Sequence, residues 1–578
     1  MKPNNTRHIA MRIQILGVFF CLLFAIIGLK AFHLQVFECK KLSDRAQQEY
    51  ERPIVSAGKR GVIYDRNLNE LAVSIHASSI AAMPSRIENV KKTAKQVAKI
   101  LNLNEKELYK RLSQSTRFTW IKRQVAPQRV SAVAALDLKG IELVPEFSRF
   151  YPHKTLAAQV LGFAGIDSKG LEGIELYYNK EIEGVAQEYK IMKDALGRGF
   201  DREAWAEEPP KANNLVLTID RTIQFIAEEA VKEATVKHEA KSGIAVVMSP
   251  QTGELLAIAH YPEFNPNAFT KFKSDAWRNR AVADAFEPGS TMKIFLAAAA
   301  LESGYCSPKS IFYCENGKYR IGPNVVHDTH SYDWMSIQDI VKHSSNIGAV
   351  KIAEMTGKKS LHTSLKSFGF GEKTGVDLPG ETAGNLSDYK KWRPIDVGNI
   401  AFGQGLSVSA VQLLRAVCAI ANGGTLVKPH LAKSVIDSSG NVIRDLTPEK
   451  GPSVISRNTA KAVAEMMHMV VLEGGTGTNA ALNHYKVCGK TGTAQKFVNG
   501  SYATGAFVAS FVGFAPQENP AVAVLVVIDE PHQKAHFGGT VAAPAFKKIV
   551  YESLNYMAIR PDDMLMASTF DEKEEKKR

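Results

Sequence analysis

Cysteine is scarce in this chain, with six residues among 578. One of them, Cys21, lies in a long apolar run, and the odd number left over is too small for a disulfide framework. Cys306 and Cys314 could pair, but their spacing alone does not decide it. Together with His327 and His330 they form a conceivable metal group, yet the spacing is not the compact one of a zinc finger. We therefore expect neither a metal nor a cofactor.

Acidic residues are outnumbered by basic ones. The chain has 59 Asp and Glu against 72 Lys and Arg, which gives a formal net charge of +13. A nucleic acid, an anionic membrane or an anionic cell-surface polymer would each suit such a balance. No nucleic-acid-binding motif is present, and the lysines look scattered along the chain. A solvated basic surface is therefore the simplest interpretation, and we expect no nucleic acid as a partner.

Long hydrophobic runs are absent except for one near the N-terminus. Residues 13–29, IQILGVFFCLLFAIIGL, contain one polar side chain, and apolar residues continue to residue 36. A helix of about 20 such residues spans a bilayer. Basic residues and no acid precede the run, so residues 1–12 should stay cytoplasmic and the chain after residue 40 should lie outside. No A-x-A-like site follows, which favours an uncleaved anchor, residues 13–36, over a cleaved signal peptide.

The rest of the chain divides into two regions, of which the first is residues 49–210. It begins with RGVIYDRNLNELA (60–72), which is typical of a turn between short strands. Residues 90–112 are rich in lysine with helical spacing, and we expect a solvated amphipathic helix there. GLEGIE (170–175) is predicted to be a loop, and AEEPPKANN (206–214) a linker.

The second region, residues 213–560, has strand patterns at both ends of a mostly helical middle. GIAVVMSPQTGELLAIA (243–259) is typical of a hairpin. Further strands and two helices are predicted at 486–494, 507–514 and 521–528, and at 220–241 and 541–556. We expect one antiparallel sheet with helices packed around it. Residues 561–578 form a charged tail.

The stretch AFEPGSTMKIF, residues 285–295, places a lysine three residues after a serine, where an apolar helix begins that should end at Gly304. Residues i and i+3 share a helix face, so Ser290 and Lys293 should touch. A serine hydroxyl needs a base before it becomes a nucleophile. Burial lowers the pKa of a lysine, which can then serve as that base. The pair therefore predicts a serine acyl-transfer site.

Two later motifs strengthen this prediction. HSSNIG supplies Ser344 and Asn346, and CGKTGTAQK supplies Lys490, Thr491 and Gly492 at the start of a predicted strand. The set S-x-x-K, S-D-N and K-T-G is shared by penicillin-binding proteins and class A β-lactamases, and the chain has S-S-N in the second place. The three motifs in this order are strong support for that chemistry.

Other copies of these motifs lack the required context. S-x-x-K also begins at Ser56 and Ser387, and a second K-T-G begins at Lys373. Glycine, tryptophan or proline close to each of them is typical of loops. Only Ser290 precedes a long apolar helix, so we expect a single nucleophile.

Over nearly its full length the chain resembles the class B penicillin-binding proteins, and FGFGEKTGVDLPGE is most similar to the division-specific FtsI type. The motifs RGVIYDRNLNELA, GLEGIE, FEPGSTMK, HSSN, AFGQGLSVSAVQL and GKTGTAQ follow that family's order. The resemblance implies an α/β (α+β) architecture with one transmembrane helix. It also implies an elongated pedestal (dimerisation-type) domain over residues 49–210 and a transpeptidase domain over residues 213–560, with a central five-stranded antiparallel sheet flanked by helices.

The resemblance also implies a function. Such proteins are membrane-anchored D,D-transpeptidases that cross-link peptidoglycan stem peptides during division, bind β-lactams, and work with a membrane glycosyltransferase and other division proteins. By this resemblance, Ser290 is expected to be the nucleophile and Lys293 the base for acylation. Ser344 would relay a proton to the leaving amine, Asn346 would hold a substrate amide, and Lys490 would keep the site positive. Thr491 and Thr493 would bind the substrate carboxylate, and the N–H groups of Ser290 and Thr493 would form the oxyanion hole. Independently of the resemblance, a glycine at position 492 of the predicted strand would let a substrate backbone come close.

Several alternatives stay open at the level of sequence. Ser344 and Asn346 could be helix N-cap residues, and Lys490 could be an exposed strand lysine. D,D-carboxypeptidases and β-lactamases share the motifs, an elongation-type transpeptidase differs only in where it acts, and a scaffold protein of the division complex could retain them unused. Arg60, Gly61, Asp65 and Glu175 are expected to serve pedestal structure rather than catalysis.

Overall fold

The computed structural model describes residues 5–42, 53–56, 58–114, 116, 118–190, 212–498, 500–532 and 535–561. The chain divides into two compact units, residues 1–58 with 185–210 and residues 59–184 with 211–578. Most of the predicted linker, up to residue 211, and the charged tail from residue 562 lie outside the described residues.

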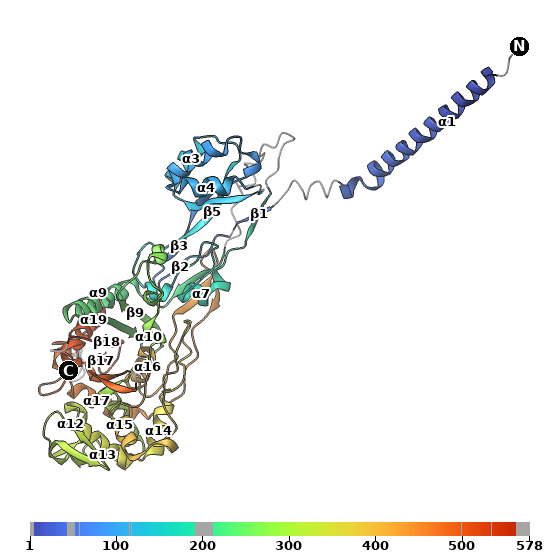
Figure 1. Ribbon diagram of the computed structural model, residues 1–578. Helices are drawn as coiled ribbons and strands as arrows, with labels where there is room; N and C mark the ends of the chain where they lie inside the picture. The colour runs from blue at the N-terminus through green and yellow to red at the C-terminus, as the bar shows by residue number, and fades with distance from the viewer. Residues whose placement is uncertain are drawn as a thin grey trace, which may run out of the picture. The chain divides into compact units, whose positions relative to one another are not determined.

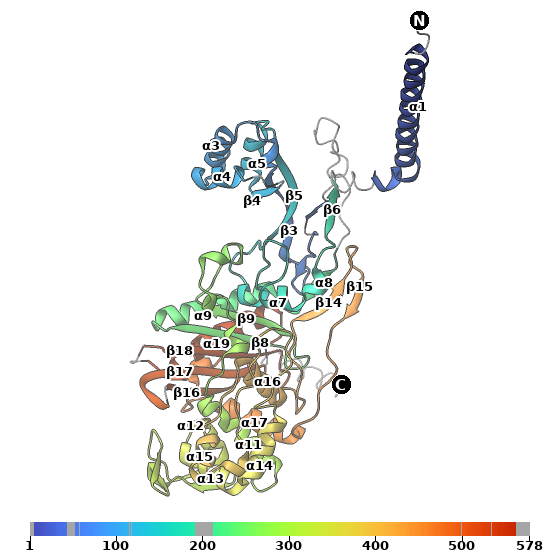
Figure 2. The same cartoon turned by 45° about the vertical axis from the view of Figure 1, so that its right-hand side comes forward.

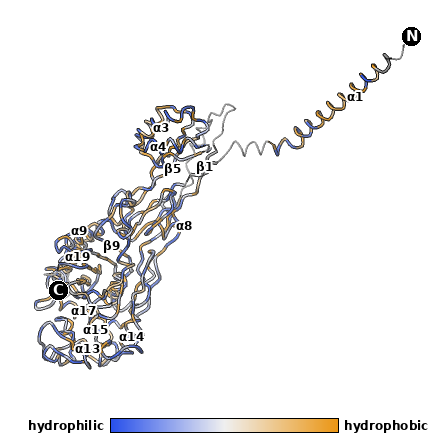
Figure 3. Tube along the Cα trace, viewed as in Figure 1, coloured by the Kyte–Doolittle hydropathy of each residue, from blue (hydrophilic) through white to orange (hydrophobic). Residues whose placement is uncertain are grey.

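The first unit contains the predicted membrane anchor. Helix α1 (Asn5–Phe32) continues into a π-helical turn (His33–Phe37). Among the described residues, this is the one helix long and apolar enough to cross a membrane, and Figure 3 shows hydrophobic residues along it. The same unit holds an antiparallel pair of strands, β1 (Pro53–Ser56) and β6 (Gln187–Lys190).

In the second unit, a seven-stranded sheet connects the pedestal region to the catalytic region. The strands run in the order β15-β14-β7-β2-β3-β4, and β5 also pairs with β3. They are β2 (Ile63–Tyr64), β3 (Glu70–Ala82), β4 (Thr119–Val125), β5 (Ile141–Phe150), β7 (Asn214–Leu217), β14 (Ala432–Ile436) and β15 (Val442–Asp445). The predicted turn joins β2 to β3, where the Asp65 carboxylate accepts hydrogen bonds from the backbone N–H groups of Asn67 and Asn69.

A buried ion cluster supports the pedestal region. Glu175 accepts hydrogen bonds from Nε of Arg60 at 2.5 Å and from Nε of Arg149 at 2.6 Å, and all three side chains are buried. Burial acts to raise the pKa of Glu175, but the two guanidinium groups outweigh it and the pKa is lowered. Glu175 belongs to helix α7 (Gly173–Tyr177), so the predicted loop at 170–175 is wrong for its second half.

Residues 83–140, which we call the head, are inserted between β3 and β5. Helices α3 (Val90–Leu101), α4 (Glu105–Leu112) and α5 (Pro127–Ala134) pack with β4 around a separate apolar core. The single helix predicted over 90–112 is wrong. Asn102 ends α3 with a φ of 54°, and the Asn104 side chain caps α4. Asparagine suits both positions because it tolerates positive φ and caps helices.

The predicted five-stranded antiparallel sheet is confirmed, in the order β16-β17-β18-β8-β9 with β16 at one edge. Its strands are β8 (Ser242–Met248), β9 (Leu255–Tyr261), β16 (Cys488–Val498), β17 (Ser501–Ala515) and β18 (Val522–Asp529). Each predicted strand is present, and the Pro250 turn joins β8 to β9.

Helices cover both faces of this sheet (Figures 1 and 2). Helices α9 (Arg221–Lys237) and α19 (Ala543–Tyr556) pack on one face, and α16 (Ala410–Ala421) packs on the other. Along β18, Leu525 and Val527 face the core under α16, whereas Val524 and Val526 face the core under α9 and α19. Burial on both faces explains why β18 is apolar without interruption.

The helical middle lies beyond α16 and carries much of the catalytic site. Its helices are α10 (Arg280–Ala283), α11 (Lys293–Glu302), α12 (Ile337–His343), α13 (Asn346–Thr356), α14 (Lys358–Ser367), α15 (Pro394–Ala401) and α17 (Arg457–Met469). Two small ribbons accompany them, β10 (Ile311–Tyr313) with β13 (Trp334–Ser336) and β11 (Lys318–Ile321) with β12 (Asn324–His327). Because α11 packs against α13 and α17, and α17 packs against β16, the motif-bearing elements converge.

Candidate active site

Ser290 lies in a short 3-10 helix, η6 (Gly289–Met292), that leads directly into α11. Gly289 has a φ of 55°, and a Cβ there would lie 3.0 Å from the carbonyl oxygen of Thr493. Any other residue would be strained and crowded at this position, so glycine allows the turn to lie against β16. The predicted apolar helix is confirmed, since residues 293–300 are all buried.

Lys293 is the centre of the site. Its side chain is only 1% exposed. Its Nζ lies 3.0 Å from Oγ of Ser290, 3.1 Å from Oγ of Ser344 and 2.8 Å from Oδ1 of Asn346. Burial lowers the pKa of Lys293 from 10.5 to about 7, against the opposing effect of the Asp328 carboxylate. A large fraction of neutral lysine is therefore available near neutral pH to accept the proton of Ser290.

Ser344, Ser345 and Asn346 form the junction between α12 and α13. Ser344 has a left-handed backbone with a φ of 62°, and its carbonyl oxygen accepts a hydrogen bond from Nζ of Lys293 at 2.6 Å. The N-cap of α13 is Ser345, whose Oγ accepts from N–H of Gly348 at 2.9 Å. The N-cap alternative therefore does not apply to Ser344 or Asn346, whose polar atoms face Lys293.

Asp328 holds this junction and is a residue that the sequence did not reveal. Its carboxylate accepts hydrogen bonds from the backbone N–H of Asn346 at 2.5 Å, from that of Ile347 at 3.1 Å and from Oγ of Ser345 at 2.6 Å. Negative charge is favourable at this end of α13. The stretch NVVHDTH, residues 324–330, has no motif that could have pointed to it.

Lys490 completes the cluster from β16. It is fully buried, so the alternative of an exposed strand lysine is wrong. Its Nζ donates to Oγ of Ser344 at 3.0 Å, and the Ser344 hydroxyl therefore lies between the two lysines. Burial, and secondarily the like charge of Lys293, hold the pKa of Lys490 well below its ordinary value. An arriving anion would favour the charged form, which refines the expectation that Lys490 keeps the site positive.

Thr491 and Thr493 project from the same face of β16, because alternate residues of a strand share a face. Oγ1 of Thr491 lies 2.9 Å from Oγ1 of Thr476 and 3.4 Å from Nζ of Lys490. Oγ1 of Thr493 accepts a hydrogen bond from N–H of Gly538 at 3.1 Å. The hydroxyls of the two predicted carboxylate-binding residues thus lie on one face of β16, and that of Thr491 lies close to Nζ of Lys490.

Gly492 lies between β17 and the turn that precedes Ser290. A Cβ at this position would lie 2.3 Å from Oγ of Ser510 and 2.9 Å from the carbonyl oxygen of Pro288. Only glycine fits without displacing the turn. Its structural role is therefore to let η6 approach β16, in addition to the room for substrate that the sequence suggested.

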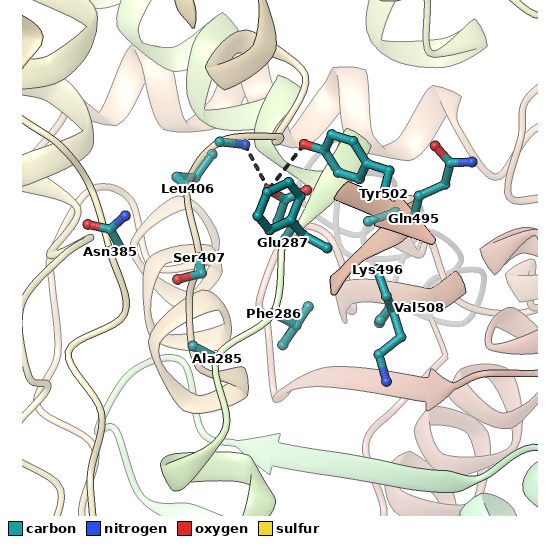
Figure 4. Close-up of a pocket in the computed structure, with 13 residues that line it drawn as sticks. Ala285, Phe286, Glu287, Asn385, Leu406, Ser407, Gln495, Lys496, Tyr502 and Val508 are labelled. Atoms are coloured by element: carbon teal, nitrogen blue, oxygen red, sulfur yellow. Dashed lines mark hydrogen bonds between the residues drawn. The ribbon is translucent and has the colours of Figure 1, made fainter. Parts of the chain in front are cut away.

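A cavity of about 430 Å³ lies beside residues 494–497, where β16 continues past the K-T-G motif (Figure 4). It is lined by Ala285, Phe286, Glu287, Asn385, Gly405, Leu406, Ser407, Ala494, Gln495, Lys496, Phe497, Tyr502 and Val508. The lining comes from the segment just before the nucleophile, a neighbouring loop and the β16–β17 hairpin. The cavity therefore adjoins the segment before the nucleophile and the edge strand β16, and none of the predicted site residues lines it.

Glu287 is the acidic group at this cavity that the sequence did not single out, although it belongs to FEPGSTMK. Its Oε1 accepts hydrogen bonds from N–H of Gly405 at 2.9 Å and from the Tyr502 hydroxyl at 3.3 Å. Its Oε2 is buried without a partner among the described residues. Burial raises the pKa of Glu287, and burial together with the Glu287 carboxylate raises the pKa of Tyr502 to about 12.

The other motif copies have different surroundings. Oγ of Ser387 accepts a hydrogen bond from Nε1 of Trp392 at 2.9 Å, and the following lysine is exposed. Lys373 lies in a loop where Thr374 hydrogen-bonds to Glu381. Ser56 ends strand β1 rather than lying in the expected loop. None of these serines begins a helix that could hold a lysine against it.

Within the described ranges, no group of three His, Cys, Asp or Glu side chains could hold a metal ion. Cys306 and Cys314 are not bonded to each other. Sγ of Cys306 lies 3.2 Å from Sδ of Met355, and Cys314 is buried with its Sγ 3.7 Å from Oγ of Ser345. These two cysteines therefore have separate packing environments.

Two family models match the chain. The dimerisation domain of penicillin-binding proteins matches residues 55–217, and the penicillin-binding protein transpeptidase domain matches residues 243–551. The second match spans more than half of the chain and includes every predicted site residue.

Known proteins resemble the chain over most of its length. The peptidoglycan D,D-transpeptidase FtsI of Escherichia coli is 32% identical over 510 residues, which cover 87% of this chain and 84% of FtsI. The probable peptidoglycan D,D-transpeptidase PenA of Neisseria gonorrhoeae is 35% identical over 562 residues, 96% of this chain and 94% of PenA. Penicillin-binding protein 3 of Mycobacterium tuberculosis, solved with aztreonam, has a TM-score of 0.68 at 26% identity and covers 88% of this chain and 98% of its own.

The family models, the relatives and the fold agree with one another and confirm the resemblance drawn from the motifs. The chain belongs to the class B penicillin-binding proteins of the FtsI type.

Proposed function

We propose that this protein is a membrane-anchored peptidoglycan D,D-transpeptidase that cross-links stem peptides through an acyl-enzyme on Ser290 during septal wall synthesis. The observation that carries the proposal is the position of Lys293. Its buried Nζ lies within hydrogen-bond distance of both Ser290 and Ser344, and the Ser344 hydroxyl also accepts from Lys490. A nucleophile, a base and a relay are therefore connected without water.

In the acylation step, neutral Lys293 takes the proton from Ser290, whose Oγ attacks the carbonyl carbon of the D-Ala-D-Ala bond. Backbone N–H groups of Ser290 and Thr493 stabilise the oxyanion. The proton passes from Lys293 through Ser344 to the leaving nitrogen. The peptide bond breaks, D-alanine leaves and the ester on Ser290 forms, while Lys293 returns to its neutral form. Asn346 is proposed to hold the substrate amide.

In the transfer step, an amine from a neighbouring stem peptide attacks the ester carbon. Lys293 accepts the proton that this amine loses and returns it to Oγ of Ser290 as the ester breaks. The products are a new peptide bond and free Ser290. The same lysine thus serves as base and then as acid in both halves, which suits a pKa near neutrality.

The carboxylate of the donor stem is proposed to bind at Lys490, Thr491 and Thr493. Charge-assisted hydrogen bonds to a carboxylate are stronger than neutral ones, and a carboxylate would also stabilise the ammonium form of Lys490. The rest of the donor stem then continues along β16 toward the cavity at Glu287 (Figure 4). Because residue 492 is glycine, η6 can lie close to β16, as this arrangement requires.

The proposed topology is a single pass through the inner (cytoplasmic) membrane. Its parts are a cytoplasmic tail, 1–12; an anchor, 13–36; a pedestal, 49–210; a transpeptidase domain, 213–560, on the periplasmic (extracytoplasmic) side; and a charged tail, 561–578. Basic residues before the apolar helix support this orientation. We also propose a membrane glycosyltransferase and other division proteins as partners, since a cross-linking enzyme needs freshly polymerised glycan.

The proposal is tested by labelling the full chain with a β-lactam and mapping the adduct. We expect one adduct, on Ser290. Ser290→Ala should abolish it. Ser387→Ala, which changes the serine of another S-x-x-K motif, is the matched control and should leave the adduct intact. An adduct that persists in folded Ser290→Ala protein would refute the assignment.

Product analysis separates the transpeptidase from its rivals. A transpeptidase forms cross-linked dimers from stem peptides, a carboxypeptidase releases D-alanine without dimers, and a β-lactamase turns over penicillin rapidly. Normal division supported by Ser290→Ala would favour a scaffold role instead. Imaging of the tagged protein in dividing cells distinguishes septal from elongation-type synthesis.

A further inference from the structure

The positive charge of the chain is concentrated in the head, which corrects the expectation of scattered lysines. Residues 83–140 contain thirteen Lys and Arg against four Asp and Glu, a net charge of +9 out of +13 for the whole chain. The other 520 residues together contribute only the remaining +4. The head, which is built around its own small core, therefore carries most of the net positive charge of the protein.

The lysines of α3 form a stripe on its exposed side. Lys91, Lys95 and Lys99 are spaced four residues apart, so they lie one above another on the helix, and Lys92 lies beside them. All four are exposed, and none forms an ion pair with another described residue. The opposite side of the helix is apolar and faces the core of the head. We call these four residues the α3 lysine stripe.

The stripe is unfavourable for the isolated helix. Like charges at i and i+4 destabilise a helix by roughly 0.2–0.5 kcal/mol per pair, and α3 has two such pairs with no acid in its sequence. Neighbouring α4 adds exposed Lys106 and Lys110, again four residues apart. An anionic surface opposite these lysines would relieve the repulsion between them.

Two observations favour a lipid surface over a soluble polymer. The second unit begins at Lys59, about 20 residues after the apolar helix ends at Phe37. A bilayer that holds the apolar helix is therefore part of the surroundings of the full chain. In addition, Tyr109 projects from α4 with 45% of its surface exposed, next to Lys110, and tyrosine is a residue that favours membrane interfaces.

We propose that the α3 lysine stripe binds the anionic phospholipid headgroups of the membrane in which the chain is anchored. Each lysine near an anionic leaflet contributes favourably to the free energy of membrane binding. The attraction decays over about one Debye length from the surface and is screened at high salt. The contact fixes a second point of the protein on the bilayer besides α1. It is independent of the acyl-transfer chemistry of the proposed function.

The test uses the full chain in nanodiscs of phosphatidylcholine with or without phosphatidylglycerol, and measures lysine acetylation by mass spectrometry. Phosphatidylglycerol should slow acetylation of the stripe lysines at least about threefold, and about 1 M salt should abolish the effect. Exposed lysines of the catalytic region, Lys358, Lys359, Lys461 and Lys547, should be unaffected and serve as internal controls.

Variants show whether the lysines act together. Lys95→Gln with Lys99→Gln should reduce the protection of Lys91 and Lys92, whereas Lys358→Gln with Lys359→Gln, the same change of charge, should leave it unchanged. Equal acetylation with and without phosphatidylglycerol would overturn the proposal. Protection by purified peptidoglycan but not by phosphatidylglycerol would overturn it in favour of a cell-wall polymer.

Discussion

Replacing Asp328 with asparagine should make β-lactam acylation less dependent on pH. In the wild-type protein Lys293 must be neutral to act as base, and its pKa is about 7. About a tenth of the molecules have a neutral lysine at pH 6 and about nine tenths at pH 8, so the acylation rate should rise about tenfold between these values. This rise is the acid limb of the pH profile.

The direction of the change follows from charge. The Asp328 carboxylate raises the pKa of Lys293, in opposition to burial. Its removal lowers that pKa, so neutral lysine is present at lower pH and the limb moves to the acid side. Asparagine keeps an oxygen that can accept from the N–H groups of Asn346 and Ile347, which Asp328 now holds at 2.5 and 3.1 Å.

The magnitude follows from the contacts. One asparagine separates the two groups, since Nζ of Lys293 lies 2.8 Å from Asn346 Oδ1 and Asp328 lies 2.5 Å from the Asn346 nitrogen. A unit charge at roughly 8 Å and an effective dielectric constant of about 20 contributes about 2 kcal/mol, or about 1.5 pH units. The ratio of acylation rates at pH 8 and pH 6 should then fall from about ten to less than about two.

The assay is stopped-flow or gel-based acylation by a fluorescent penicillin over pH 5.5–8.5. Comparison of rates within each protein makes the result independent of any general loss of activity. Asp339→Asn, which removes a carboxylate that caps α12 instead, is the matched control and should keep the tenfold ratio. An unchanged ratio in Asp328→Asn, or a limb moved toward alkaline pH, would refute the electrostatic argument.

Three further outcomes are expected. Glu175→Gln should lower the free energy of unfolding by about 3–5 kcal/mol in denaturant titrations, because it leaves Arg60 buried without its carboxylate; a loss below about 1 kcal/mol would contradict this. Gly492→Ala should slow acylation at least about tenfold at unchanged protein fold, since the new methyl group displaces the turn before Ser290, and a normal rate would show that the turn can adjust. Lys490→Ala should weaken acylation by substrates with a free carboxylate more than by their neutral esters, in parallel kinetic measurements; equal losses would remove Lys490 from that role.

Site residues that are close to one another in the sequence could be predicted from the sequence. Ser290 and Lys293 are three residues apart, and helix geometry alone brings them together. The hairpin around Pro250 and the buried strand at Val522 were predictable for the same reason, because their patterns are local. Motif order then linked Ser344 and Lys490 to them, although only the fold places the Ser344 hydroxyl between the two lysines.

The parts that depend on tertiary contacts could not be predicted. Asp328 acts on a junction 18 residues away and has no local pattern. Glu287 gains its significance from Gly405 and Tyr502, which belong to distant segments. The break of the head helix at Asn102 was visible in principle, because asparagine is a helix-ending residue, but the lysine periodicity on both sides concealed it. The positive charge of the head was missed because the net charge was counted over the whole chain and not for each region.

The position of β16 at the edge of its sheet has a consequence for inhibitor design. One side of the strand pairs with β17, and among the described residues no strand of this sheet pairs with the other side. Edge strands bind extended peptides through main-chain hydrogen bonds, with alternate side chains of the ligand pointing the same way. An extended peptidomimetic with a serine-reactive group would therefore obtain affinity from the backbone of residues 494–497 itself. Resistance by side-chain substitution would be difficult against such contacts, because every residue except proline presents the same backbone groups.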